Sequence, residues 1–513
     1  MNIHDILLLE PFHVPANMKN YDAKHLINKN ASFPVDYMTY LAGIMYIKAG
    51  ILATKFHSVP LGLAQISAIL KERGINTSHE PFILDALKRP LSDSEIENRI
   101  RSHDYDQVWM SVGSQDEAKE AIRYAGIVKS IDAETLVMLG GIFPTFYPEW
   151  FLRQPAIDLI IRGPAEDAVR QYVMNGDAAR ACVPGLCHKH KNEIFIAPIP
   201  ETPPDQAKLP AMDLEGMNIE AYMKDNPFAN LLTSRGCPFS CPFCSHTAYW
   251  GKAVQYRNME NVRKELRMFQ DHGCKTGYIV DSAFTLNEKH VQRFVDVFKQ
   301  EKITIKFAFE TRADHFNNSM AKLCASFKPA LVWFGGESGA LEILSRLPGK
   351  QGGGGRDHLR DMKAAVKNAN DANIISGSSW IIGLPGETNK TIEETKRFIL
   401  ELFKAGMDIA DVRNLQIFPG TDYYDNAVKW GLFIDGGTIR LEKGPWQETV
   451  SHHTSDMSGN QIKAATKAIQ SEILEFYKSK PDHRRILRAI TAVQFMARHP
   501  SIARTLIRAA NKI

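Results

Sequence analysis

Three cysteines within eight residues constrain the fold and chemistry of this chain more than any other feature. Cys237, Cys241 and Cys244 lie in the run Ser234-Arg-Gly-Cys-Pro-Phe-Ser-Cys-Pro-Phe-Cys244, and the whole chain of 513 residues holds only seven cysteines. The chance that such a spacing arises by accident is on the order of one in a thousand. Three thiolates on one loop can ligate three irons of a [4Fe–4S] cluster and leave the fourth iron open to a small molecule.

A structural zinc site is the second interpretation of the same loop. His246 would join the three cysteines to complete a Cys3His tetrahedron. Structural zinc loops more often use a shorter gap between paired cysteines, and Phe243 would have no role beside zinc. Beside an open iron, by contrast, the ring of Phe243 offers a face on which an adenine can stack. The cluster is therefore the favoured interpretation.

Further motifs extend a resemblance that begins with this loop. A Cys-x3-Cys-x2-Cys loop with an aromatic residue before the last cysteine resembles the loop of the radical SAM superfamily. Downstream motifs fall where that family has successive strand ends, namely Asp281–Thr285, Thr311–Asp314, Phe334–Gly339, Ile382–Glu387 and Phe418–Thr421. The first two hundred residues resemble the cobalamin-binding domain that precedes the barrel in one large subgroup. The chain thus resembles the cobalamin (B12)-binding radical SAM enzymes, whose methyltransferases form class B.

The first domain is expected to be an α/β unit over residues 1–200, with a doubly wound, Rossmann-like parallel sheet. Short apolar runs predict strands at Asp5–Leu9, Val108–Val112, Leu136–Leu139 and Leu159–Ile161, with a helix from Val59 to Gly74. Ligands of such sheets bind beyond the carboxyl ends of the strands. The candidate cobalamin contacts at these ends are Glu10, Ser111, Gly113, Gly140, Gly141, Gly163 and Glu166. Glycine pairs alone would also fit ordinary turns after strands.

A histidine ligand for cobalt is not evident in this domain. The broader cobalamin-domain family often supplies one from an Asp-x-His-x-x-Gly loop after the first strand, where this chain has Glu10-Pro-Phe-His-Val-Pro15. The radical SAM relatives commonly lack that loop too. His13 and His57 are expected to be ordinary surface or core histidines rather than cobalt ligands. Phe143 stands where relatives usually carry histidine, which leaves the corrin contact there open.

The second domain is expected to be a partial (β/α)6 barrel over residues 228–428, joined through a proline-rich linker at 201–227. Strands are predicted at Asn230–Thr233, Tyr278–Val280, Ile305–Phe309, Leu331–Phe334, Ile374–Ile382 and Val412–Phe418. By resemblance, Cys237, Cys241 and Cys244 ligate the cluster, and the candidate contacts of S-adenosylmethionine (SAM) are Phe243, Asp281, Ser282, Arg312, Glu337, Gly383 and Pro385. The polar residues among them would equally fit as ordinary strand-end charges.

A helical, basic region is predicted over residues 429–513. From His483 to Ile513 the chain has arginines and lysines but no acidic residue. An amphipathic basic helix there would either contact a membrane surface or acidic partner peripherally, or cover the barrel. Tyr37–Thr54 is largely apolar but contains Lys48, and is expected to be a buried helix rather than a membrane anchor.

Composition narrows the cellular setting. A formal net charge of +4 is too small to indicate a protein that binds nucleic acid through an overall basic surface. The odd number of cysteines argues against a secreted disulfide framework, and the N-terminus lacks the features of a signal peptide. A cytoplasmic protein is therefore expected.

The resemblance implies reductive cleavage of SAM to a 5′-deoxyadenosyl radical, with an electron from a donor such as flavodoxin or ferredoxin. Methyl transfer through cobalamin to an unactivated carbon of a small molecule is the leading hypothesis. The alternatives are radical cyclisation, rearrangement or oxidation without methyl transfer and, more distantly, a non-catalytic cobalamin or Fe–S sensor. A methylthiotransferase would need cysteines near the N-terminus, whereas the first here is Cys182. The aromatic and apolar insertion at 16–57 suggests a hydrophobic substrate.

Overall fold

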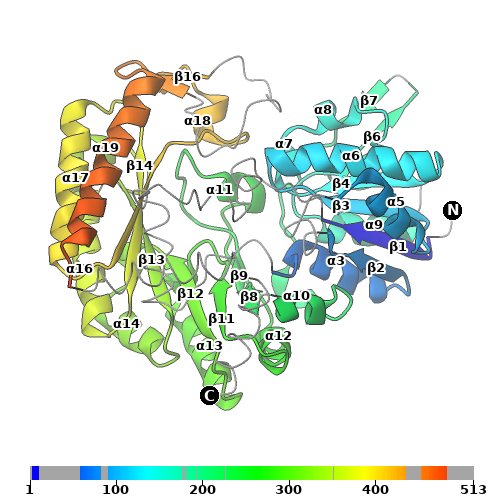
Figure 1. The fold of residues 1–513 in the computed structure, drawn as a ribbon, viewed down its shortest axis with the longest axis horizontal. Helices are drawn as coiled ribbons and strands as arrows, with labels where there is room; N and C mark the ends of the chain where they lie inside the picture. Colours follow the sequence, from blue (N-terminus) through cyan, green and yellow to red (C-terminus); the bar gives the residue numbers. More distant parts are fainter. Residues whose placement is uncertain are drawn as a thin grey trace, which may run out of the picture.

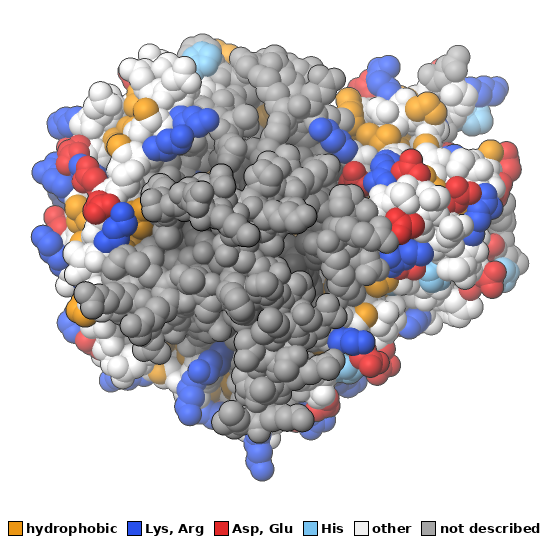
Figure 2. All heavy atoms as spheres, viewed as in Figure 1, with side chains coloured by type: hydrophobic (Ala, Val, Ile, Leu, Met, Phe, Trp, Pro, Cys, Tyr) orange, Lys and Arg blue, Asp and Glu red, His pale blue; other side chains and the backbone are white. Residues whose placement is uncertain are grey.

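The computed structural model describes residues 3–10, 58–82, 91–175, 180, 182–191, 193–225, 227–350, 352–434 and 452–481 (Figure 1). The expectations for His13, His57, Tyr37–Thr54 and 483–513 lie outside these residues. No described helix is long and apolar enough to cross a membrane. On the face shown in Figure 2, basic and acidic side chains are intermixed over the described surface.

The N-terminal sheet has seven strands in the order β2-β1-β3-β4-β5-β6-β7. Its strands are β1 (Asp5–Leu9), β2 (Asn76–Glu80), β3 (Gln107–Ser111), β4 (Leu136–Gly140), β5 (Leu159–Ile161), β6 (Leu186–His190) and β7 (Glu193–Phe195). The first five are parallel, and β6 and β7 add antiparallel pairs at one edge. The expected α/β fold with a doubly wound parallel sheet is confirmed, with this antiparallel addition.

Helices on both faces explain why β1 is an unbroken apolar run. Ile6 and Leu8 belong to one buried cluster with residues of α3 (Leu61–Lys71), while Leu7 and Leu9 belong to another. That second cluster includes residues of α5 (Asp93–Arg101) and α6 (Gln115–Ile131). A strand covered on both faces has no solvent side on which polar residues would be favoured. The carboxyl ends of the strands are left uncovered by these helices.

Edge strand β2 was not predicted, because its sequence Asn-Thr-Ser-His-Glu is polar. Only its last two residues, His79 and Glu80, are buried. His79 lies within hydrogen-bond distance of Leu8 O (3.1 Å) and of the Tyr222 hydroxyl (3.0 Å). Burial lowers the pKa of His79 to about 4, so its ring is neutral at pH 7.

The second sheet is parallel throughout, in the order β15-β14-β13-β12-β11-β8, as expected for a partial barrel. Its strands are β8 (Phe228–Leu231), β11 (Thr276–Ile279), β12 (Lys306–Thr311), β13 (Leu331–Glu337), β14 (Ser376–Ile382) and β15 (Ile409–Asn414). The outer helices include α12 (Met259–Asp271), α13 (Glu288–Gln300), α14 (Asn318–Ala325), α16 (Arg356–Asp371) and α17 (Asn389–Lys404) (Figure 1). The predicted inner face of α12 is buried at Val262, Leu266 and Phe269.

Helix α19 (Gly459–Lys478) covers the open edge of this sheet at β15. Ile462, Ile469 and Ile473 are buried on its inner face. The side chain of Gln470 donates to Val412 O at 2.7 Å, and the Tyr477 hydroxyl accepts from Ala410 N at 3.0 Å. These contacts satisfy backbone groups that an edge strand would otherwise expose. The exact domain limits stay a prediction.

Candidate functional site

The three clustered cysteines lie on a loop that follows the first barrel strand. Short strand β9 (Ser234–Arg235) pairs with β10 (Gln255–Tyr256) just before Cys237, and α11 (Ser245–Trp250) begins directly after Cys244. Cys237 N donates to Gly251 O at 3.3 Å, and Cys244 N donates to Cys241 O at 3.1 Å. All three thiols are free and half-buried. We call residues 237–244 the cysteine loop.

The donor set fits a cluster better than a single metal ion. Among the described residues, no group of three or more His, Cys, Asp or Glu side chains is close enough to hold one ion. His246, which zinc would require, instead places Nδ1 3.0 Å from the Ser282 hydroxyl. The irons of a cube hold its cysteine ligands farther apart than one tetrahedral ion does. Burial, together with Glu337, raises the pKa of Cys241 to about 12, so metal binding there must release a proton.

Glu337 ends β13 beside the cysteine loop in an unusual backbone conformation. Its φ is +59°, a left-handed value that costs a non-glycine residue on the order of 1 kcal/mol. The side chain is 11% exposed, and Oε1 lies 3.4 Å from the Nζ of the buried Lys350. Strain of this kind is retained where it positions a side chain for a ligand. Glu337 is thus held between Lys350 and the cysteine loop, and its contact with SAM stays a prediction.

Arg312 lies against the cysteine loop itself. Its guanidinium carbon is 3.6 Å from the centroid of the Phe239 ring. It also donates to both carboxylate oxygens of Asp314, at 2.7 and 3.0 Å, and to Gly349 O at 2.9 Å. Most of its donors are therefore already used within the protein, and its stacking on Phe239 fixes the loop.

Asp281 anchors the entry to the cysteine loop. Its carboxylate accepts from Thr233 N at 2.7 Å, from the Thr233 hydroxyl at 2.5 Å and from the Ser234 hydroxyl at 2.7 Å. The residue is 3% exposed. The predicted Asp281 and Ser282 therefore lie at the mouth, but each already has protein partners.

The turn after β14 presents backbone to the same region. Gly383 and Gly386 have φ of +95° and +81°. The buried Glu387 carboxylate accepts from Gly383 N at 2.6 Å and Leu384 N at 3.2 Å, and burial raises the pKa of Glu387 to about 8. The run Gly-Leu-Pro-Gly-Glu was recognised in the sequence, yet Glu387 was not assigned a role. It holds the turn in shape.

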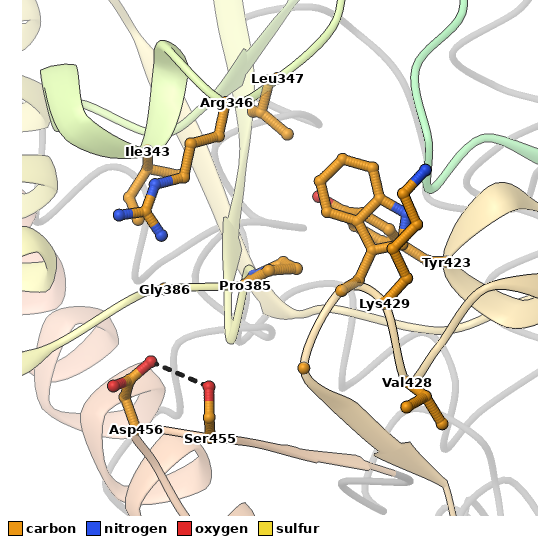
Figure 3. A pocket seen from close by; sticks show the side chains of 12 residues that line it. Ile343, Arg346, Leu347, Pro385, Gly386, Tyr423, Val428, Lys429, Ser455 and Asp456 are labelled. Atoms are coloured by element: carbon orange, nitrogen blue, oxygen red, sulfur yellow. Dashed lines mark hydrogen bonds between the residues drawn. The ribbon is translucent and has the colours of Figure 1, made fainter.

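A cavity of about 350 Å³ opens beside this turn (Figure 3). Pro385, Gly386 and Arg346 lie on one side, and Tyr423 and Lys429 on the other; Trp430 also lines the cavity. Tyr423 N donates to Pro242 O in the cysteine loop at 2.9 Å, and its ring lies 6.3 Å from that of Phe243. The cavity therefore adjoins the cysteine loop through the pair Phe243 and Tyr423.

The carboxyl edge of the N-terminal sheet is built from backbone and small side chains. Gly141 has φ of +101°, and a Cβ there would lie 2.6 Å from Val112 O. Gly113 N, after Ser111, donates to Glu117 at 2.6 Å. The Thr145 hydroxyl donates to Gly141 O at 2.7 Å and accepts from Gly163 N at 2.9 Å, joining two glycine loops. Such a cradle admits a large ligand close to the backbone.

At this edge Glu10 has a carboxyl oxygen available to a ligand, whereas Phe143 has its ring packed in the core. The buried Oε2 of Glu10 has no hydrogen-bond partner among the described residues, and burial with the nearby Glu117 raises the pKa of Glu10 to about 8. A neutral carboxyl there fits the amide groups that fringe a corrin. Phe143 is buried against Tyr147 and Phe151, so it is a core residue rather than a ligand. The backbone cradle and Glu10 fit the group that the sequence implies.

Glu166 does not lie free at this edge. It forms a buried ion pair with Arg235, which precedes the cysteine loop. The Tyr147 and Tyr424 hydroxyls, 3.3 Å apart, also link the N-terminal domain with the barrel. The carboxyl edges of the two sheets thus meet at the cysteine loop.

Comparisons with known proteins agree with the assignment of both domains. The B12 binding domain family matches residues 47–173, and the Radical SAM superfamily matches residues 231–399. An uncharacterized methyltransferase of Pyrococcus horikoshii, PH0819, is 30% identical over 417 residues, which are 79% of this chain and 86% of that protein.

Two further comparisons are more distant. The anaerobic magnesium-protoporphyrin IX monomethyl ester cyclase of Rubrivivax gelatinosus is 24% identical over 66% of this chain and 61% of its own length. The solved structure of the radical SAM methyltransferase TsrM of Kitasatospora setae, with tryptophan and a SAM analogue, aligns with a TM-score of 0.63. That alignment covers 86% of this chain and 79% of TsrM at 16% identity, a likeness of fold.

Proposed function

This chain belongs to the radical SAM enzymes that carry a B12-binding domain, and we propose that it methylates an unactivated carbon of a small molecule. One observation carries the proposal: the residues on either side of the cysteine loop contact the loop that follows β5 of the B12-binding sheet, through Arg235 with Glu166 and Tyr249 with Gly163. A substrate at this junction can reach both a radical source and a methyl carrier. The bound cluster and cobalamin would supply electron transfer and methyl carriage.

The residues at the barrel mouth divide into binding and supporting roles. Cys237, Cys241 and Cys244 are the cluster ligands. Glu337 would accept from the amino or ribose groups of SAM, and Phe243 would flank the adenine together with the turn at Gly383 and Pro385. Asp281, with its hydrogen bonds to Thr233 and Ser234, supports the loop. Arg312 and Ser282 add polar contacts at the rim.

The N-terminal edge would hold the corrin by shape. Ser111 and Gly113 after β3, and Gly140 and Gly141 after β4, would let the ligand approach the backbone. Gly163 and the neutral carboxyl of Glu10 would face its amide fringe. A site between the two edges that is closed to water would protect a reactive radical from quenching.

The similarity to a magnesium-protoporphyrin ester cyclase keeps a second function open, in which the radical closes a ring without methyl transfer. SAM with a ¹³C-labelled methyl group separates the two. Methyl transfer predicts S-adenosylhomocysteine and 5′-deoxyadenosine in equal amounts, with the label in the product. Release of 5′-deoxyadenosine without S-adenosylhomocysteine would favour the cyclase and contradict methylation.

The substrate and partners follow from the same site. An apolar part of a small molecule would pack on Tyr423, Trp430 and Leu347 in the cavity wall, which also carries the charged Arg346, Lys429 and Asp456. Flavodoxin or ferredoxin would be the electron donor in the cytoplasm, and the basic residues 483–513 would provide any peripheral membrane contact. An enzyme that modified only small polar metabolites would overturn the choice of an apolar substrate.

A further inference from the structure

A buried ion pair crosses the boundary between the two domains at the cysteine loop. Arg235, two residues before Cys237, donates from Nη1 to Oε1 of Glu166, the first residue of α9 (Glu166–Asn175). The two side chains are 8% and 4% exposed. Taking both charges out of water carries a desolvation cost that their attraction does not always repay.

The same loop of the N-terminal domain also binds the other end of the cysteine loop. The Tyr249 hydroxyl, in α11, donates to Gly163 O at 3.0 Å. The next residue, Trp250, places its ring under the guanidinium of Arg235, 4.2 Å from centroid to carbon. Residues 163–166 are therefore attached both before Cys237 and after Cys244.

These attachments continue into the glycine cradle. Gly163 N donates to the Thr145 hydroxyl, which donates to Gly141 O. A continuous chain of contacts thus runs from Gly141, at the expected corrin site, to Arg235, at the cluster site. This chain of contacts connects the two sites physically.

A second buried ion pair offers a comparison, because it does not involve residues 163–166. Arg257 and Glu265 both lie in the barrel domain and form two hydrogen bonds, at 2.6 and 2.7 Å. Glu265 also accepts from Met212 N, so its oxygens are satisfied. By contrast, Glu166 Oε2 and Arg235 Nε are buried with no partner among the described residues. The interdomain pair is less well satisfied, as expected if its position serves more than stability.

We propose that Glu166, Arg235 and Tyr249 are positioning residues that set the distance and orientation between the cluster site and the cobalamin site. The inference rests on the proposed function in requiring both cofactors. Glu166 is bound to Arg235 through Oε1, and the expectation that Glu166 touches the corrin stays a prediction.

The test uses full-length protein reconstituted anaerobically with iron, sulfide and hydroxocobalamin, then reduced to the paramagnetic states of both centres. Pulsed electron paramagnetic resonance measures the distance between cobalt and cluster. Glu166→Gln, Arg235→Lys and Tyr249→Phe are expected to keep the iron and cobalt content of the wild type while broadening the distance distribution. SAM cleavage uncoupled from product should rise about tenfold, because small misplacements of reacting groups slow the productive step.

Glu265→Gln is the matched control, since it breaks a buried ion pair that makes no contact with residues 163–166. It should lower the melting temperature but leave the cobalt–cluster distance unchanged. Tyr249→Phe removes a single hydroxyl and keeps the test valid if the charge variants do not fold. A wild-type distance in Glu166→Gln and Tyr249→Phe would overturn the proposal, as would loss of cobalt from Glu166→Gln. A wild-type protein with both cofactors but no methyl transfer would count against the proposed function alone.

Discussion

The two sheets present carboxyl edges of opposite construction to one another. The barrel edge consists of charged or thiol side chains held by partners, such as Glu337 with Lys350 and Arg312 with Asp314. The edge of the N-terminal sheet consists of glycine backbone, with Gly141 packed against Val112. Side chains bind a ligand through charge and coordination, whereas glycine backbone without side chains lets a large ligand approach closely. The barrel edge should therefore be damaged by removing side chains, and the N-terminal edge by adding them.

The largest effect is expected from Cys241→Ala, which removes one of the three thiolates on which the cluster depends. Iron content after reconstitution should fall to near background, and reductive SAM cleavage should be lost with it, while cobalamin binding at the other edge persists. Iron analysis and 5′-deoxyadenosine assays measure both. The buried Cys274 lies outside the loop, and Cys274→Ala should keep its iron. Full iron in Cys241→Ala would contradict the ligand assignment.

Adding one methyl group at the carboxyl edge of the N-terminal sheet should weaken cobalamin binding. In Gly141→Ala the Cβ would meet Val112 O in a backbone conformation that disfavours side chains, at a cost of about 1–3 kcal/mol. Cobalamin content should fall several-fold while iron content remains. Gly126→Ala is the control, because Gly126 lies within α6 with open space around its missing Cβ, and it should be neutral or stabilising. Equal cobalamin retention in both variants would remove the distinction between the edges.

A smaller effect is expected from Glu337→Gln, which keeps the shape but removes the charge. If Glu337 accepts a hydrogen bond from SAM, affinity should fall by about tenfold, the size of one charge-assisted bond. Calorimetric titration of the reconstituted protein with SAM measures it. Glu342→Gln, which breaks the exposed pair with Arg346, should leave the affinity unchanged. An unchanged dissociation constant in Glu337→Gln would assign this carboxylate to the support of Lys350 alone.

The smallest effect is a difference between the carboxyls of Glu10 and Glu387 in how stability depends on pH. The pKa of Glu10 is raised from 4.5 to about 8, so the fold favours its protonated form. Stability is fully present below about pH 4.5 and is lost as the pH rises through 8. Glu10→Gln removes that loss, so it should be slightly more stable than the wild type at pH 9, with little difference at pH 5.

Glu387 has a pKa raised to the same value of about 8, but its carboxylate accepts two backbone hydrogen bonds. Glu387→Ala removes the acceptor of both bonds and should therefore destabilise the barrel at pH 5 and at pH 9 alike. Denaturant unfolding of both variants across this pH range makes the comparison. A gain in stability at pH 9 for Glu387→Ala would show that the turn at Gly383 does not need its carboxylate.

The sequence predicted the inner strands better than the edges. Strand β1 has the predicted bounds Asp5–Leu9, because a strand buried on both faces is a plain apolar run. Polar β2 and the β6–β7 hairpin carry no such pattern and were missed. Strand β15 begins at Ile409, three residues before the predicted Val412, since its start is covered by α19 rather than marked by its own residues.

The candidate site was predicted as a set of motifs but not as a set of contacts. The spacing of Cys237, Cys241 and Cys244 identified their loop directly. The pairing of Glu166 with Arg235 joins residues 69 positions apart in different domains, and no local pattern reports it. In the same way, Asp281 was placed correctly at a strand end, but its hydrogen bonds to Thr233 and Ser234 depend on how β8 and β11 pair.

The central claim is that one chain holds a cluster and a cobalamin at facing edges. Iron and cobalt content after anaerobic reconstitution with iron, sulfide and hydroxocobalamin tests it most directly. The account predicts about four irons and about one tightly held cobalt per chain. A chain that bound its irons but no cobalt would contradict the account, and methyl transfer through cobalamin would have to be abandoned.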